Sequence, residues 1–152
     1  MRALIQRSGP ASVRVDQQTI GAIDRGLVVL LGFTHDDGDD DLAWIVRKTT
    51  ELRIFEDDEG RMNRDVRDAG GSLLLVSQFT LYADCRRGRR PAFTDAMEPH
   101  RAESMWERAV AAFASTGLPV ATGRFGAMMQ VALVNDGPVT ISLESPRPGV
   151  LR

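Results

Sequence analysis

Three polar segments end or interrupt apolar, β-prone runs of the chain, and they hold the residues best suited to chemistry. They are residues 77–83 (Ser-Gln-Phe-Thr-Leu-Tyr-Ala), 123–129 (Gly-Arg-Phe-Gly-Ala-Met-Met) and 135–138 (Asn-Asp-Gly-Pro). Hydroxyl groups, exposed main-chain amides and an aromatic ring at a strand end can bind a small polar group or stack on a nucleobase. The residue types alone therefore predict a small binding site formed by strand ends.

The pair Gly137-Pro138 is the most unusual of these features, because it lies between two runs that otherwise resemble one strand. Proline lacks the N–H group that a sheet needs, and glycine gives up side-chain packing while it permits another backbone to approach. The pair therefore either forms a tight turn, for which Asn-Asp-Gly-Pro has suitable chemistry, or serves a site. A cis bond before proline costs only about 0.5–1 kcal/mol, so the geometry of this bond bears on the choice.

Side-chain constellations of familiar hydrolases are missing. The only histidines are His35 and His100, and neither lies beside a serine or cysteine. The sequence contains no Gly-x-Ser-x-Gly, His-Glu-x-x-His, Cys-x-x-Cys or phosphate-binding loop motif. An aspartate-rich stretch at residues 36–41 cannot be placed in the register of a calcium loop, so we interpret it as helix capping and solvated charge. We therefore expect neither a metal nor an organic cofactor.

Composition predicts an ordinary globular protein. The 152 residues, 43% of them hydrophobic, are enough for one domain over residues 1–152, with residues 146–152 as a loose C-terminal tail. Cys85 is the only cysteine, so no disulfide can form within the chain, which favours a reducing, cytoplasmic compartment. The first residues are too polar for a signal peptide, and no run of about 18 apolar residues predicts a membrane span.

Charge is distributed unevenly along the chain. The formal net charge of −2 argues against indiscriminate binding of nucleic acid, and we expect no DNA partner. Basic residues nevertheless gather in one loop, where they form a possible phosphate-binding cluster of Arg86, Arg87, Arg89 and Arg90. Lys48 is the only lysine among 19 basic residues, and this bias toward arginine has a GC-rich genome as its alternative explanation.

Hydrophobic periodicity predicts more strands than helices. Alternation in residues 11–15 and 19–23 predicts a hairpin, and the continuous apolar run at residues 26–33 predicts a central strand buried on both faces. Helical spacing of apolar residues predicts helices over 39–52 and 99–115. Further strands are expected at 53–55, 73–79, 120–126, 128–134 and 139–143. The fold class predicted is α+β, with curved, largely antiparallel, barrel-like sheets covered by two main helices.

Residues 77–83 and 135–140 closely resemble the two signature motifs of the D-aminoacyl-tRNA deacylases, the D-tyrosyl-tRNA(Tyr) deacylase family. Shorter matching strings are residues 1–7, 52–55, 88–91 and 122–126, in the same order, and the similarity extends to about Leu143. The resemblance implies hydrolysis of the ester that joins a D-amino acid, or mischarged glycine, to the terminal adenosine of tRNA. It also implies a homodimer with active sites at the subunit interface.

The resemblance assigns a role to each segment. Ser77 and Gln78 would line the aminoacyl pocket, and the main-chain amides of Phe79 and Thr80 would stabilise the negative charge that develops on the ester. A cis Gly-Pro peptide, here Gly137-Pro138, would project into the partner's pocket and exclude L-aminoacyl groups, braced by Arg7. The segment that holds the terminal adenine corresponds to Phe125, Gly126 and Met129, for which strand packing is the alternative.

The implied chemistry is assisted by the substrate itself. If the 2′-hydroxyl of the terminal ribose helps to activate water or the ester, the protein needs no side-chain base. A nucleophilic Thr80 would need such a base, and the sequence places none beside it, so a hydrogen-bonding threonine is favoured. Two other functions stay open at this point, a noncatalytic RNA 3′-end binding protein and a general esterase or peptidase.

Two departures from the family pattern affect the expected structure. Ser8-Gly9-Pro10 replaces the usual polar and apolar run after Arg7 and predicts a β-bulge in the first strand. Met128 stands where relatives commonly have a polar or acidic residue.

Overall fold

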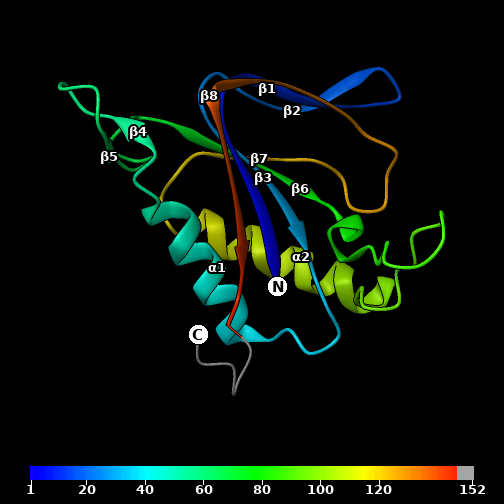
Figure 1. Ribbon diagram of the computed structural model, residues 1–152. Helices are drawn as coiled ribbons and strands as arrows, with labels where there is room; N and C mark the ends of the chain where they lie inside the picture. The colour runs from blue at the N-terminus through cyan, green and yellow to red at the C-terminus, as the bar shows by residue number, and fades with distance from the viewer. Residues whose placement is uncertain (147–152) are drawn as a thin grey trace.

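A computed structural model describes residues 1–146, so the tail predicted for 146–152 lies outside the described residues beyond Pro146. One mixed sheet forms the centre of the fold (Figure 1). Its strands follow one another in the order β2 (Gln18–Ile23), β1 (Arg2–Val15), β3 (Gly26–Gly32), β6 (Ser72–Ser77) and β7 (Val120–Thr122), and β8 (Gln130–Glu144) also pairs with β1. The long β1 therefore connects both parts of the sheet.

Strand direction follows from the connections. The pairs of β1 with β2, β3 and β8 are antiparallel, whereas β3 pairs with β6, and β6 with β7, in parallel. The parallel pairs arise because a helix crosses over between the strands, α1 (Asp39–Glu51) after β3 and α2 (Pro99–Ala114) after β6. The sheet also curls, since a Cβ atom on Gly21 of β2 would lie only 2.5 Å from the carbonyl oxygen of Thr122 of β7. The α+β class with a barrel-like sheet is thus confirmed.

Both helices cover the same face of the sheet (Figure 1). Alternate residues of the central strands bury opposite faces: Leu73 and Leu75 of β6 pack toward the helices, whereas Leu74 and Val76 join the second cluster inside the curled sheet. This explains why the central strands are apolar throughout rather than alternating. The helix bounds differ from the predicted ones by a single residue at the C-terminal end of each.

One buried hydroxyl on α1 is unsatisfied. Thr49 is 0% exposed, and within residues 1–146 its Oγ1 has no hydrogen-bond partner. We expect Thr49→Val to raise the free energy of unfolding by about 1 kcal/mol, because valine has the same shape without a desolvated polar atom. Urea denaturation measures this. Thr50→Val is the matched control, since Thr50 donates to the Val46 carbonyl at 3.0 Å on a more exposed face, and stabilisation by both substitutions alike would contradict the explanation.

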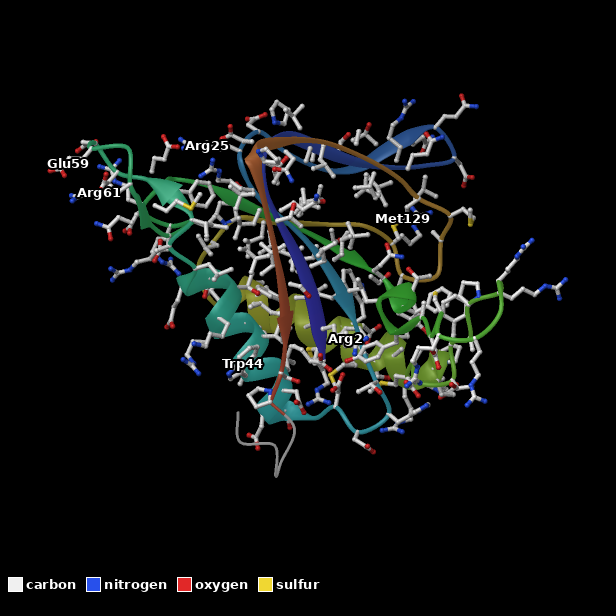
Figure 2. All side chains as sticks on the ribbon, viewed as in Figure 1. Arg2, Arg25, Trp44, Glu59, Arg61 and Met129 are labelled. Carbon is white, nitrogen blue, oxygen red and sulfur yellow. The ribbon has the colours of Figure 1, made fainter. Side chains whose placement is uncertain are left out.

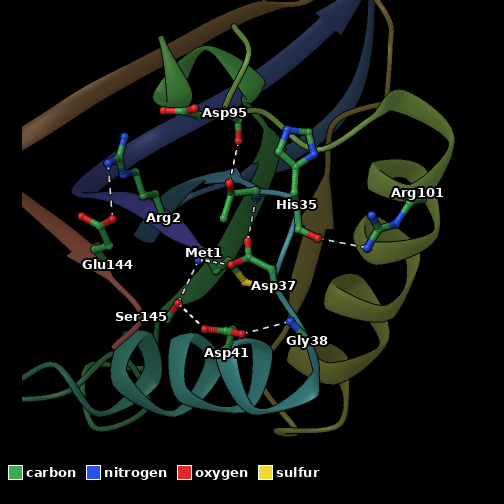
Figure 3. Close-up of polar contacts among 11 residues, drawn as sticks. Met1, Arg2, His35, Asp37, Gly38, Asp41, Asp95, Arg101, Glu144 and Ser145 are labelled. Atoms are coloured by element: carbon green, nitrogen blue, oxygen red, sulfur yellow. Dashed lines mark hydrogen bonds and ion pairs between the residues drawn. The ribbon is translucent and has the colours of Figure 1, made fainter. Parts of the chain in front are cut away.

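Polar contacts join the start of β1 to the end of β8 and the start of α1 (Figure 3). The Met1 ammonium pairs with Asp37 and donates to Ser145 Oγ at 2.8 Å, and Ser145 Oγ in turn donates to Asp41 Oδ1 at 2.6 Å. Burial raises the pKa of Asp37, although its hydrogen bonds to the ammonium and to Thr34 oppose that shift. These contacts fix the lower end of the β1–β8 pair against α1.

A small hairpin of β4 (Phe55–Glu56) and β5 (Met62–Arg64) extends from the opposite end of the molecule (Figure 1). Figure 2 shows Glu59 and Arg61 at its tip, far from Met129. The strand predicted at residues 53–55 corresponds to β4, which begins two residues later and is one residue shorter than predicted. The Asp57 carboxylate accepts from the amides of Glu59 and Arg61 and closes the turn, which lowers its pKa.

Candidate active site

A cavity of about 630 Å³ opens where β6 ends and η1 (Phe79–Tyr82) begins. Its wall is formed by the end of β3, the end of β6 with η1, the segment before α2, the start of α2, and the segment between β7 and β8 with the start of β8. The polar and aromatic residues among those lining it are Phe33, Ser77, Gln78, Phe79, Phe93, Glu98 and Phe125. Two of the three segments selected from the sequence thus meet in one pocket.

The main chain changes direction at the end of β6. The Gln78 amide donates to the Leu31 carbonyl at 2.7 Å, and η1 starts at the next residue. At this helix start the amides of Phe79 and Thr80 have no hydrogen-bond acceptor among residues 1–146. Two adjacent N–H groups are therefore free beside the pocket, which is the arrangement that stabilises an oxyanion.

Thr80 shows no sign of activation as a nucleophile. Its hydroxyl accepts a hydrogen bond from the Gln78 side-chain amide, and the side chain is exposed. Neither His35 nor His100 lines the pocket. His35 instead contacts the Thr94 carbonyl at 2.7 Å. Within residues 1–146, moreover, no cluster of ligating side chains could hold a metal ion.

The segment after β7 forms the opposite side of the pocket. Phe125, Gly126 and Met129 all line it, so the residues expected to hold an adenine ring do face the same cavity as residues 77–79. Figure 2 shows Met129 on this connecting segment between β7 and β8. Exposed Met128 also lines the pocket, and its apolar side chain there suits a stacking surface.

Part of the pocket wall was not predicted from the sequence. Phe93 makes an edge contact with Phe79, with ring centroids 4.9 Å apart and an angle of 64° between the ring planes. Met97 and Glu98 line the same pocket. The Glu98 carboxylate caps α2 by accepting from the amides of His100 and Arg101, which lowers its pKa. Only the cap has a linear signal, an acid directly before a proline at the helix start.

The Gly137–Pro138 peptide bond is cis and lies in a bulge of β8, which continues as one strand through it. Opposite Gln6 stands Thr140, whereas opposite Ser8 stands Asn135, so β8 has extra residues here. The Asn135 side chain closes the bulge by accepting from the Val139 amide at 2.7 Å. The sequence therefore correctly identified an irregularity, but it is a bulge within one strand and not a turn between two. Neither Gly137 nor Pro138 lines the pocket of its own chain.

Arg7 lies under this bulge and holds it. Its side chain is 7% exposed, its Nε donates to the Asp136 carbonyl at 2.8 Å, and its Nη1 donates to the Ile54 carbonyl at 2.5 Å. A second bulge follows in β1. Ser8 pairs with Asn135 of β8 and Ala11 pairs with Leu133, so β1 has one extra residue between these two pairs. The bulge predicted from Ser8-Gly9-Pro10 is thus confirmed, and Arg7 still bonds the carbonyl of Asp136, directly before Gly137.

The arginine loop is closed at its base by Asp84 and Ala92, which exchange main-chain hydrogen bonds of 2.7 and 2.9 Å. Arg86 is not free, because it pairs with Asp84 at 2.7 Å and so holds the pKa of that carboxyl well below its usual range. The remaining arginines of the loop are exposed and have no acidic partner within residues 1–146, namely Arg87, Arg89 and Arg90. The loop therefore carries unneutralised positive charge beside the pocket.

Together these features define a class of α+β protein whose pocket, at the ends of sheet strands, presents main-chain donors and aromatic surfaces instead of a catalytic side-chain triad. The chain belongs to the D-Tyr-tRNA(Tyr) deacylase family, whose profile matches residues 4–144. Among its relatives, D-aminoacyl-tRNA deacylase of Halalkalibacterium halodurans is 52% identical over 145 residues, covering 95% of this chain and 99% of the relative. The protein of that name from Syntrophotalea carbinolica is 57% identical, covering 95% and 97%.

Solved structures agree with the fold. A protein described as c-Myc DNA unwinding element binding protein is 42% identical, with a TM-score of 0.91 over 97% of this chain and 100% of that one. A probable eukaryotic D-amino acid tRNA deacylase is only 17% identical but has a TM-score of 0.79 over 93% and 97%, which supports the fold alone. None of the helices in residues 1–146 is long and apolar enough to cross a membrane.

Proposed function

We propose that this protein hydrolyses the ester bond of D-aminoacyl-tRNA, and of mischarged glycyl-tRNA, to release the amino acid and free tRNA in the cytoplasm. The observation that carries the proposal is the pair of free main-chain amides at Phe79 and Thr80, beside an apolar pocket. Family membership supplies the substrate class. The terminal adenine would lie against Phe125, Gly126 and Met129, and the aminoacyl ester would lie near Ser77 and the two amides.

The chemistry needs no side-chain base. Water attacks the ester carbonyl, the C–O bond to the ribose breaks, and the ribose oxygen takes a proton as tRNA leaves. The neighbouring 2′-hydroxyl of the terminal ribose assists this transfer. The Phe79 and Thr80 amides stabilise the oxyanion, because donors that are fixed in place cost no reorganisation as the charge develops. A reaction of this kind needs no activated Thr80, which agrees with an exposed Thr80 whose hydroxyl bonds, among residues 1–146, to Gln78.

Rejection of L-substrates would come from a second subunit. Gly137 and Pro138 are exposed and present main-chain carbonyls on a bulge held by Arg7. In a homodimer this bulge would enter the partner's pocket and occupy the space that an L side chain requires. Two observations support a dimer: β8 pairs on one edge only among the described strands, and exposed apolar residues lie along it, Val131 at 36% and Val134 at 61%.

Incubation with D-tyrosyl-tRNA and L-tyrosyl-tRNA in separate reactions tests the function. We expect release of D-tyrosine and no release of L-tyrosine above the uncatalysed rate. Release of neither, with tRNA still bound, would indicate a noncatalytic RNA-end binding protein instead. Comparable release of both would refute the proposed filter and indicate a general esterase.

A further inference from the structure

Most arginines of residues 1–146 have a partner for the guanidinium group. Arg47 pairs with Glu51 at 3.8 Å, Arg64 pairs with Asp58 at 2.9 Å, and Arg67 donates to the Thr116 carbonyl at 2.8 Å. In that part of the chain, the guanidinium groups without an acidic, carbonyl or aromatic partner are those of Arg53, Arg87, Arg89, Arg90 and Arg124. Guanidinium groups without any such partner are therefore restricted to a few places.

Nearly all of these free arginines flank the pocket. The loop that carries three of them ends at Ala92, and the next residue, Phe93, is part of the pocket wall. Arg124 directly precedes Phe125, which lies on the other side of the same cavity. Exposed arginines without a partner thus lie in two segments that continue directly into the pocket wall, on a protein whose formal net charge is −2. A protein with a negative net charge does not attract RNA as a whole, so these arginines would have to act locally.

The main chain at Arg124 is fixed relative to the pocket. The Gly123 amide donates to the Leu75 carbonyl of β6 at 2.8 Å, and the Arg124 carbonyl accepts from the Ala127 amide at 3.3 Å. The residues inside this turn, 125–127, all line the cavity. The Arg124 side chain therefore begins at the rim of the pocket, and it is exposed.

A nucleoside bound in this pocket determines where its phosphate must lie. The proposed function, on which this inference rests, places the terminal adenine against Phe125, Gly126 and Met129. The 5′-phosphate of that adenosine carries a charge that an apolar cavity would desolvate at high cost, so it stays at the mouth. Arginine suits this position because its planar group can donate two hydrogen bonds to one phosphate.

We propose that Arg124 is a phosphate-binding residue that holds the 5′-phosphate of the terminal adenosine. The arginine loop, on the other side of the mouth, contacts phosphates further along the strand. A single exposed charge pair of this kind is expected to change affinity by about 2- to 5-fold. Because it acts on the nucleotide and not on the amino acid, Arg124 contributes to affinity and leaves D-over-L preference unchanged.

The test uses two nonhydrolysable probes, D-tyrosine joined by an amide to the 3′-position of adenosine, with either a 5′-hydroxyl or a 5′-phosphate. For the unmodified protein we expect the phosphate to tighten binding about 2- to 5-fold at low salt, measured by calorimetry. Arg124→Gln should abolish that gain without weakening binding of the 5′-hydroxyl probe, and Arg124→Lys should retain part of it. The matched control is Arg47→Gln on the outer face of α1, which should retain the full gain.

A variant with Arg87, Arg89 and Arg90 all changed to glutamine separates the two sides of the mouth. It should keep the 5′-phosphate gain for the mononucleotide probe, yet lose affinity and salt dependence for a longer RNA ending in CCA. Equal binding of both probes by the unmodified protein, or a full gain in Arg124→Gln, would overturn the phosphate proposal alone. Binding of neither probe would overturn the proposed function together with it.

Discussion

Replacing Gly137 by alanine is expected to lower the rate of D-aminoacyl-tRNA hydrolysis about 100-fold, the effect typical of displacing a positioned group by about 1 Å. Gly137 has a φ of +139°, and a Cβ atom there would lie 2.8 Å from Val139 Cγ2 and 3.2 Å from Arg7 Nη2. The bulge must therefore move to accept the methyl group. If the bulge is the filter in the partner's pocket, single-turnover hydrolysis with D- and L-tyrosyl-tRNA will show a reduced D-to-L ratio as well as the lower rate.

Gly9→Ala is the matched control for this substitution. Gly9 lies in β1 of the same sheet, and an added Cβ atom would have nothing within 4 Å, so the variant should keep its activity and selectivity. Thermal unfolding of both variants shows whether lost activity reflects lost folding. Full activity and full D-selectivity in a folded Gly137→Ala variant would contradict a role for the bulge in the site.

The spacing of apolar residues along the chain was sufficient to predict the helices and strands in which that spacing is regular. Leu42, Ile45 and Thr49 recur at helical spacing and are buried on α1, and the apolar run at residues 26–33 became β3 at the centre of the sheet. Positions of this kind could be predicted because side-chain burial follows directly from helix or strand geometry. Strand pairing is different, since the parallel pairs of β6 depend on where two crossover helices pack, and no short window of sequence contains that information.

The candidate site was predictable to the extent that its residues are contiguous. Residues 77–80 form one strand end and the start of η1, so their contribution to a pocket follows from the polar end of an apolar strand. Phe93 and Met97 have no such signal, because only tertiary packing brings the segment before α2 against η1. For Arg86 the structure adds a contact that was not predicted from the sequence: the guanidinium group pairs with Asp84, whereas the other loop arginines have no acidic partner among the described residues.

In the proposed function, main-chain atoms take the roles that side chains have in a catalytic triad. The proposed filter against L side chains must present atoms that carry no side chain of their own, and main-chain carbonyls at Gly137 and Pro138 would meet that need. Under the same proposal, main-chain donors at Phe79 and Thr80 would stabilise the oxyanion in the same way, without side-chain freedom to lose. Side chains then act behind the surface, as Arg7 and Asn135 do by bonding main-chain atoms of the bulge.

Replacing Arg7 by alanine is expected to lower the free energy of unfolding by about 2–4 kcal/mol, since two carbonyl groups lose a charged donor. These are the carbonyls of Asp136 and Ile54, which Arg7 joins at 2.8 and 2.5 Å. Loss of this link also frees the Gly137-Pro138 bulge, so D-over-L selectivity should fall in conditions where the variant remains folded. Urea denaturation at one fixed protein concentration measures the first effect, because a dimer's stability depends on concentration.

Arg14→Ala tests whether the effect is specific to that position. Arg14 lies on the same strand but is exposed, with one hydrogen bond to the Gln17 carbonyl at 2.9 Å, so its loss should cost no more than about 0.5 kcal/mol. Arg7→Lys keeps the charge but cannot bond both carbonyls in the same planar geometry, and it should fall between the two in stability. An Arg7→Ala variant that is as stable and as D-selective as Arg14→Ala would show that the bulge keeps its position without Arg7. A variant that loses stability but keeps its selectivity would show instead that Arg7 supports the fold and not the filter.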